Sequence, residues 1–272
     1  LSEDDLASLE PLNPLAGLVF IETDAFDDET ADSDEALPER IDLSLAKVTD
    51  LRYGENPHQQ AALYQTGETG GIAGAEQLNG KEMSFNNYVD AEAAWNLVGD
   101  LAERAVAIIK HTNPSGVGVG DSNEQAYRRA LSTDPVSAFG GIVAFNRKVD
   151  AIVASSANEV FTEVVIAPDF DDDAIDIFRA KKNLRVLRAK PNAESSPVQF
   201  KQISGGMLVQ TKDVHLLAAA DLKIVTKKQL GEADIEAMML AWTVCKHVKS
   251  NAIVIANRHQ TIGVGSGQMN RV

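Results

Sequence analysis

The amino-acid sequence predicts an α/β fold in which mixed β-sheets are covered by helices. From about residue 37 onward, short apolar runs typical of buried strands alternate with segments whose apolar residues recur at helical spacing. The chain has 272 residues, of which 44% are hydrophobic and 24% charged. This is an ordinary balance for a globular protein, and the length is sufficient for one large domain or two moderate ones.

Seven segments have the apolar, β-branched composition of strands. They are residues 105–109, 141–146, 162–167, 184–189, 206–211, 251–257 and 261–265. The last two are expected to pair through the polar turn between them. Asn-Pro-Ser-Gly at 113–116 is expected to form a turn after the first strand, because these residue types favour turns.

Five segments have the periodicity of helices. The first, 90–102, places four apolar side chains on one face: Ala94, Leu97, Val98 and Leu101. Three more are expected over 123–131, with Asn123 as the N-cap, over 149–158 and over 171–181. The fifth is expected to carry five apolar residues on one face: Ile235, Met238, Met239, Trp242 and Cys245.

Acidic residues are concentrated at the start of the chain. The net charge is −15, but residues 1–36 contain twelve acidic residues and no Lys or Arg, so residues 37–272 have 28 acidic and 25 basic residues. We therefore expect residues 1–36 to be an acidic tail or linker of unassigned role, and residues 37–272 to form the folded body. The body has no clustered Lys/Arg surface, so we expect no nucleic-acid partner.

A reducing, cytoplasmic setting is expected from the cysteine content. Cys245 is the one cysteine, which excludes an internal disulfide and a multi-cysteine zinc site. No apolar run approaches the ~20 residues that span a bilayer, so no membrane association is expected. The chain starts at Leu1, which suggests a piece of a longer protein.

The first candidate site is LRYGENPHQQAALY, residues 51–64. Its Gly54 and Asn56-Pro57 predict an irregular bend that displays Arg52, Tyr53 and His58. An arginine held in this way is suited to forked contacts with a phosphate or carboxylate. On spacing alone, a surface turn with an ordinary arginine is the favoured interpretation.

The second candidate site is KHTNPSGVGVG, residues 110–120. Lys110 and His111 come where a buried strand ends, which is where α/β sheets place ligands. His111 is suited to act as a general base near neutral pH, and Lys110 to stabilise a developing oxyanion. The Gly- and Pro-rich residues that follow could bring backbone close to a substrate. The alternative is a histidine hydrogen-bonded into the turn beside a solvated lysine.

Two further segments carry polar or ring-bearing candidates. In STDPVSAFGG, residues 132–141, a sharp loop places Phe139 and Gly140 before a strand. Phe139 either packs in the core, which is the favoured expectation, or faces a ring. In the last segment, 247–272, Asn251 at the start of a strand could hydrogen-bond a carboxamide or a base edge. GVGSG at 263–267 is weak evidence for dinucleotide binding, because no following helix is visible.

Together these segments resemble the transformylase half of the bifunctional purine enzyme family that combines AICAR transformylase with IMP cyclohydrolase. The resemblance runs from about residue 37 to 272. It rests on seven strings in this order: LRYGENPHQ, LNGKEMSFNN, IKHTNPSGVG, DPVSAFGGIVAFN, EVVIAP, KQISGGMLVQ and VKSNAIV…TIGVGSGQM.

The resemblance implies an activity, a fold and an assembly. The activity is transfer of a formyl group from 10-formyltetrahydrofolate to the 5-amino group of the aminoimidazole carboxamide ribonucleotide AICAR. The fold is similar to cytidine deaminases, with two α/β lobes of which the second is incomplete here, and active sites are shared across a homodimer. No zinc is expected, because the sequence lacks His-x-Glu with Pro-Cys-x-x-Cys.

The resemblance also implies roles for individual residues. His111 removes the amine proton, Lys110 stabilises the oxyanion and Asn251 orients the reacting groups. The implied substrate-binding residues are Arg52 near the phosphate, Tyr53, His58, Asn87, Phe139, Gly140, Glu163, Arg271 and Val272. Ser250 lies where some relatives bind a monovalent cation, so K⁺ is a possible ligand.

The sequence departs from the family pattern at both ends. The cyclohydrolase domain and the C-terminal segment of the family are not represented, so no ring closure is expected from this chain, and another chain could supply the missing segment. Two alternatives remain open: a non-catalytic interaction fragment, and a nucleotide-binding sensor without the chemistry. Lys110, His111 and Asn251 favour an enzyme, because scaffolding requires none of them.

Overall fold

The computed structural model describes residues 37–67, 70–191, 196–225, 227 and 229–270. The expected acidic tail, 1–36, and the expected substrate-binding residues Arg271 and Val272 lie outside the described residues.

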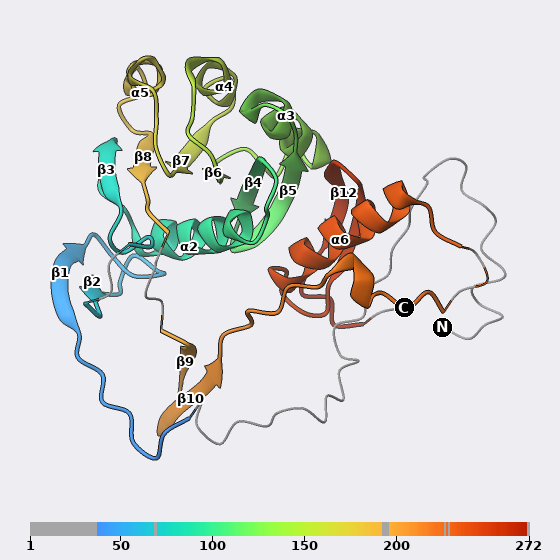
Figure 1. The fold of residues 1–272 in the computed structure, drawn as a ribbon. Helices are drawn as coiled ribbons and strands as arrows, with labels where there is room; N and C mark the ends of the chain where they lie inside the picture. The colour runs from blue at the N-terminus through green and yellow to red at the C-terminus, as the bar shows by residue number, and fades with distance from the viewer. Residues whose placement is uncertain (1–36, 68–69, 192–195, 226, 228, 271–272) are drawn as a thin grey trace.

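A mixed eight-stranded sheet is the centre of the structure (Figure 1). Its strands, in spatial order, are β11 (Ile253–Asn257), β12 (Gln260–Gly265), β5 (Asn113–Val119), β4 (Ala105–Lys110), β6 (Gly141–Phe145), β7 (Thr162–Ala167), β8 (Arg185–Arg188) and β3 (Glu76–Asn79). Strands β6, β7 and β8 are parallel to one another, and the other neighbours are antiparallel. The predicted mixed sheet is therefore confirmed.

Helices cover both faces of this sheet, as the sequence predicts. They are α2 (Phe85–Gly99), α3 (Asn123–Thr133), α4 (Ala151–Ala157), α5 (Asp172–Arg179) and α6 (Glu232–Lys246), with a short 3₁₀ helix at Ala219–Asp221. Two hairpins lie outside the main sheet: β1 (Ala46–Leu51) with β2 (Ala61–Gln65), and β9 (Val198–Ile203) with β10 (Gly206–Thr211). The strand predicted at 206–211 is thus present, but it belongs to a separate hairpin.

Strand β4 shows how two hydrophobic cores form. Because side chains alternate across a strand, Ala105, Ala107 and Ile109 pack on the side of α2 and α6. Val106 and Ile108 pack on the side of α3, α4 and α5. Figure 1 shows α2 on one side of the sheet and α3, α4 and α5 on the other. The apolar run at 105–109 therefore reflects burial on both faces, which is why the sequence identifies it so clearly.

The turn predicted at 113–116 is wrong, because these residues begin strand β5. Strand β5 pairs with β4, and α3 lies directly against it. A Cβ atom at Gly116 would lie 2.0 Å from the carbonyl oxygen of Ala130, and one at Gly118 would lie 2.3 Å from that of Ala126. The glycines of this segment therefore allow a helix to approach a strand.

Two helix starts also differ from the prediction. Helix α2 begins at Phe85, where the side chain of Ser84 accepts a hydrogen bond from the Asn87 backbone N–H. The cap of α3 is Ser122, whose hydroxyl accepts from Gln125 N–H, and the predicted cap Asn123 is buried instead. Asn123 accepts a hydrogen bond from Arg104 and donates one to the Lys148 carbonyl.

Helix α6 buries a different face from the predicted one. Its buried residues are Ala237, Leu240, Ala241, Val244 and Cys245, so Cys245 is the one residue shared with the prediction. The other four predicted residues are half-buried. Burial raises the pKa of the Cys245 thiol, which fits a packed side chain. No helix in the described part of the chain is both long and apolar enough to cross a membrane.

Candidate functional site

The loop between β4 and β5 consists of two residues, His111 and Thr112. Lys110 pairs with Asn113 across the hairpin, so the turn begins directly after Lys110. Both turn residues have left-handed backbone, with φ of 50° for His111 and 66° for Thr112. Such turns strongly favour Gly, Asn and Asp, and a β-branched residue in this conformation is unusual. The surroundings of the turn must therefore stabilise it.

Three hydrogen bonds fix this turn. The Asp90 carboxylate, on α2, accepts from the Thr112 backbone N–H at 2.7 Å. The carbonyl of His111 accepts from the Thr112 hydroxyl at 2.6 Å and from the Asn113 amide at 3.0 Å. His111 itself is exposed. The peptide group that follows His111 is thus held at both its carbonyl and its N–H, while the residue faces solvent.

The Lys110 ammonium is held by uncharged groups. Its Nζ donates to the carbonyl oxygens of Phe139 at 3.0 Å and Gly140 at 2.9 Å. Within the described residues it forms no ion pair. The Phe139 ring lies 5.2 Å from that of Phe161, centroid to centroid, and Phe139 is exposed, so the expected core role of Phe139 is wrong. A half-buried, unneutralised cation is suited to stabilise negative charge on a bound molecule.

Gly140→Ala is expected to lower turnover through Lys110. Gly140 has φ of 67°, and a Cβ there would lie 3.1 Å from Lys110 Nζ and 3.4 Å from the Phe161 ring. Because displacement by about 1 Å can cost ~10²-fold, we expect kcat to fall by about 10-fold. The matched control is Gly205→Ala, which has φ of 80° and no neighbour within 4 Å. Equal kcat values for the two variants would contradict this role of Gly140.

Asn251 is linked to the same turn through Asn113. The Asn113 Oδ1 accepts from the Lys249 backbone N–H at 3.1 Å. Two residues further on, the Asn251 side chain donates to the Gln268 carbonyl at 3.1 Å, and its carbonyl accepts from the Gln268 N–H. The candidate cation residue Ser250 is exposed, with its Oγ 3.4 Å from Asn251 Oδ1. The structure thus connects the segments that carry Lys110, His111 and Asn251.

The loop between β1 and β2, residues 52–60, contains Arg52 and contacts α2 near Asp90. It is called the Arg52 loop below. Gly54 N–H donates to the Gln59 carbonyl at 2.9 Å, which closes the predicted bend. The Asn86 side chain in the first turn of α2 donates to the Glu55 carbonyl at 3.3 Å. The Arg52 guanidinium lies 5.6 Å from the centroid of the Tyr53 ring. Helix α2 therefore contacts the Arg52 loop at its start and the His111 turn about one helical turn later.

Three other predicted site residues have different surroundings. Asn87 completes the cap of α2, where its Oδ1 accepts from the Ser84 N–H at 3.1 Å. His58 is exposed in the Arg52 loop. Glu163 forms an ion pair with Arg185 at 2.6 Å, and Arg185 also donates to the Glu82 carbonyl. Arg185 was missed by the sequence reasoning, because nothing local to it signals a partner 22 residues away.

Strand pairing gathers most of these residues at one edge of the sheet. The carboxyl end of β4, with Lys110, lies beside the amino end of β6, which follows Gly140. The amino end of β7, near Glu163, lies beside that of β6. The candidate site thus lies where the carboxyl end of β4 meets the amino ends of β6 and β7, which are parallel to each other, with β6 antiparallel to β4. In the described residues, no group of three or more His, Cys, Asp and Glu side chains could hold a metal ion.

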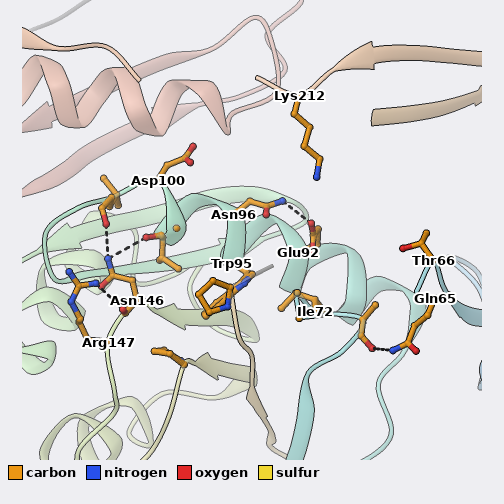
Figure 2. Close-up of a pocket in the computed structure, with 18 of the residues that line it drawn as sticks. Gln65, Thr66, Ile72, Glu92, Trp95, Asn96, Asp100, Asn146, Arg147 and Lys212 are labelled. Carbon is orange, nitrogen blue, oxygen red and sulfur yellow. Dashed lines mark hydrogen bonds between the residues drawn. The ribbon is translucent and has the colours of Figure 1, made fainter. Parts of the chain in front are cut away.

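A cavity of about 610 Å³ is lined by none of the predicted site residues. Figure 2 shows its wall around Trp95, Asn96, Asp100, Asn146 and Arg147. This is the opposite edge of the sheet, because Asn146 directly follows β6.

The polar groups of this cavity already have partners within the chain. Asp100 bonds His247 at 2.7 Å and Lys246 at 2.9 Å. Burial acts to raise the pKa of Asp100, but these two partners together outweigh burial and lower that pKa. The Arg147 guanidinium donates to the carbonyls of Asn146 and Ala102. We therefore place the candidate chemistry at the β4–β5 turn and regard the cavity as a structural groove.

Known proteins match the whole chain. A family model described as the AICARFT/IMPCHase bienzyme matches residues 2–272. The Bifunctional purine biosynthesis protein PurH of Halalkalibacterium halodurans is 45% identical over 280 residues, covering 100% of this chain and 55% of that protein. The proteins of the same name from Bacillus mycoides and Bacillus subtilis match with the same identity and coverage. The chain thus spans about half the length of the curated relatives it matches.

Proposed function

The chain belongs to the AICARFT/IMPCHase bienzyme family, and on that premise we propose that it transfers a formyl group from 10-formyltetrahydrofolate to the 5-amino group of AICAR. This reaction would be a step of purine biosynthesis, the process that appears in the names of the relatives. The observation that carries the proposal is the arrangement of Lys110 and His111. Lys110, whose ammonium forms no ion pair within the described residues, ends strand β4, and His111 follows it on a turn whose left-handed backbone is fixed by three hydrogen bonds.

Each step of the reaction has a residue suited to it. The amine of AICAR is a weak nucleophile, because its lone pair is delocalised into the imidazole and carboxamide. His111 would accept a proton from this amine as the nitrogen bonds to the formyl carbon. Lys110 would stabilise the oxyanion of the tetrahedral intermediate. The bond from the formyl carbon to the folate nitrogen then breaks, and the proton held by His111 returns to that nitrogen. Asn251 would orient the reacting groups.

The remaining residues would bind the substrates. Arg52 has no ion pair in the part of the chain that the structure describes, so its guanidinium is suited to a phosphate. Phe139 and Gly140, beside Lys110, would contact the substrate near the reacting atoms. The family also suggests a homodimer with shared sites, a cytoplasmic location and K⁺ near Ser250, and these remain proposals.

Arg52→Ala is expected to weaken binding of AICAR much more than binding of its dephosphorylated nucleoside. A hydrogen bond to a charged group is worth roughly 1.5–3 kcal/mol, so we expect a loss of about 10- to 100-fold in affinity for the ribonucleotide. The matched control is Arg179→Ala, which removes an exposed arginine on α5. Calorimetric titration with both ligands measures the effect. An equal loss for nucleotide and nucleoside would show that Arg52 does not bind the phosphate.

Product formation tests the function itself. The intact protein is incubated with AICAR and 10-formyltetrahydrofolate, and the formylated ribonucleotide is measured by mass spectrometry. Turnover supports the proposal. Binding of AICAR without turnover would favour a nucleotide-binding sensor, and the absence of both would favour a non-catalytic interaction fragment.

A further inference from the structure

The carboxylate that holds the His111 turn comes from a different element of the fold. Asp90 lies on α2, 22 residues before Thr112 in sequence, and its Oδ1 accepts from the Thr112 N–H at 2.7 Å. None of the sequence segments on which the family resemblance rests contains Asp90. Its partner is a backbone group, so Asp90 acts on the shape of the turn.

This hydrogen bond compensates for an unfavourable backbone conformation. Thr112 is β-branched and has φ of 66°, and the preceding His111 also has positive φ. Such residues are strained, and their conformation persists where several surrounding contacts hold the backbone in place. A charged acceptor gives a stronger hydrogen bond than a neutral one. Without Asp90, the Thr112 backbone would be released toward a relaxed geometry, and the adjacent His111 would move with it.

Asp90 is itself held in a fixed position. The N-cap of α2 is closed by reciprocal hydrogen bonds between Ser84 and Asn87. The residue after Asp90, Ala91, is fully buried, so the helix cannot shift without disturbing the core. The carboxylate is therefore presented to the turn from a rigid element, and its position is set by the hydrophobic packing of α2 against the sheet.

We infer that Asp90 is a positioning residue for His111, fixing the left-handed turn so that the imidazole is oriented for proton transfer. The inference rests on the proposed formyl transfer. Asp90 would not contact substrate: its effect reaches the reaction through the Thr112 N–H and the backbone of His111.

The test compares Asp90→Ala and Asp90→Asn in the intact protein. Because misplacement of a reacting group by about 1 Å can cost ~10²-fold, we expect Asp90→Ala to lower kcat by roughly 10- to 100-fold. The KM for AICAR should change less than about 3-fold, since the ribonucleotide contacts remain. Asp90→Asn keeps an oxygen acceptor for the Thr112 N–H, so it should recover most of the lost rate. Glu92→Ala is the matched control, because this carboxylate on the same helix accepts from Asn96 and not from the turn.

The substitution Thr112→Gly separates positioning from general destabilisation. Glycine adopts positive φ without strain, so the turn would no longer need the carboxylate. We expect Asp90→Ala to cost at most about 3-fold in kcat when it is combined with Thr112→Gly, compared with the larger loss when Thr112 is retained.

The outcomes distinguish this inference from the proposed function. Unchanged kcat in Asp90→Ala, or the same loss with and without Thr112→Gly, would overturn the role of Asp90 while formyl transfer by the wild type stands. A fall in kcat that is matched by Glu92→Ala would also overturn it. A wild-type protein without formyl transfer would overturn the proposed function, and the inference with it.

Discussion

Replacing Lys110 or His111 with alanine is expected to reduce formyl transfer by the intact protein by about 10²- to 10⁴-fold, because His111 is proposed as the general base and Lys110 as the group that stabilises the oxyanion. His111 is exposed on the β4–β5 turn, so no buried contact is lost. Lys110 is half-buried, and its ammonium donates to the carbonyl oxygens of Phe139 and Gly140. Both variants should therefore keep the fold and lose the chemistry.

The measurement is kcat for each variant, together with the midpoint of thermal unfolding. Lys182→Ala and His215→Ala serve as controls, because both residues are exposed and lie outside the candidate site. Rates within a few-fold of wild type for both Lys110→Ala and His111→Ala would refute the assigned roles. A fall in rate accompanied by a large fall in the unfolding midpoint would indicate damage to the fold instead.

Gly118→Ala is expected to have a large effect on stability. The added Cβ would lie 2.3 Å from the Ala126 carbonyl oxygen and 2.7 Å from the Ala130 nitrogen, both backbone atoms of α3. The helix would have to move away from β5. Overpacking typically costs about 1–3 kcal/mol, and we expect about 3 kcal/mol here because the obstructing atoms are backbone.

Gly263→Ala, on strand β12, is the matched control. No atom lies within 4 Å of a Cβ at this position, so the substitution should change the free energy of unfolding by less than about 1 kcal/mol. Urea denaturation of the two variants measures the difference. Similar unfolding free energies would show that α3 does not approach β5 as closely as described.

The sequence predicts the central strands well because they are buried on both faces. Segments 105–109, 141–146 and 162–167 correspond to β4, β6 and β7, whose residues are almost all buried. Strand β5 was missed because Asn-Pro-Ser-Gly has the local composition of a turn. The need for glycine there arises from α3, and contact with α3 is a tertiary feature that local composition does not encode.

The candidate site could be predicted only in part, for a related reason. Lys110 and His111 are visible in the sequence because they directly follow a strongly apolar strand. The carbonyls of Phe139 and Gly140 contact Lys110 from 29 and 30 residues away, and Asp90 contacts Thr112, the residue after His111, from 22 residues away. Local patterns carry no information about such pairs. Asn113 lies within the motif that drew attention to the site, but its contact with Lys249 spans 136 residues.

The most direct test of the central claim is to locate AICAR on the intact protein by NMR titration. The backbone amide of Thr112 reports on the β4–β5 turn, and the indole N–H of Trp95 reports on the cavity at the opposite edge of the sheet. We expect AICAR to shift the Thr112 amide in a saturable manner and to leave the Trp95 indole unchanged. A saturable shift of Trp95 with an unchanged Thr112 amide would contradict the assignment of the active site to the turn.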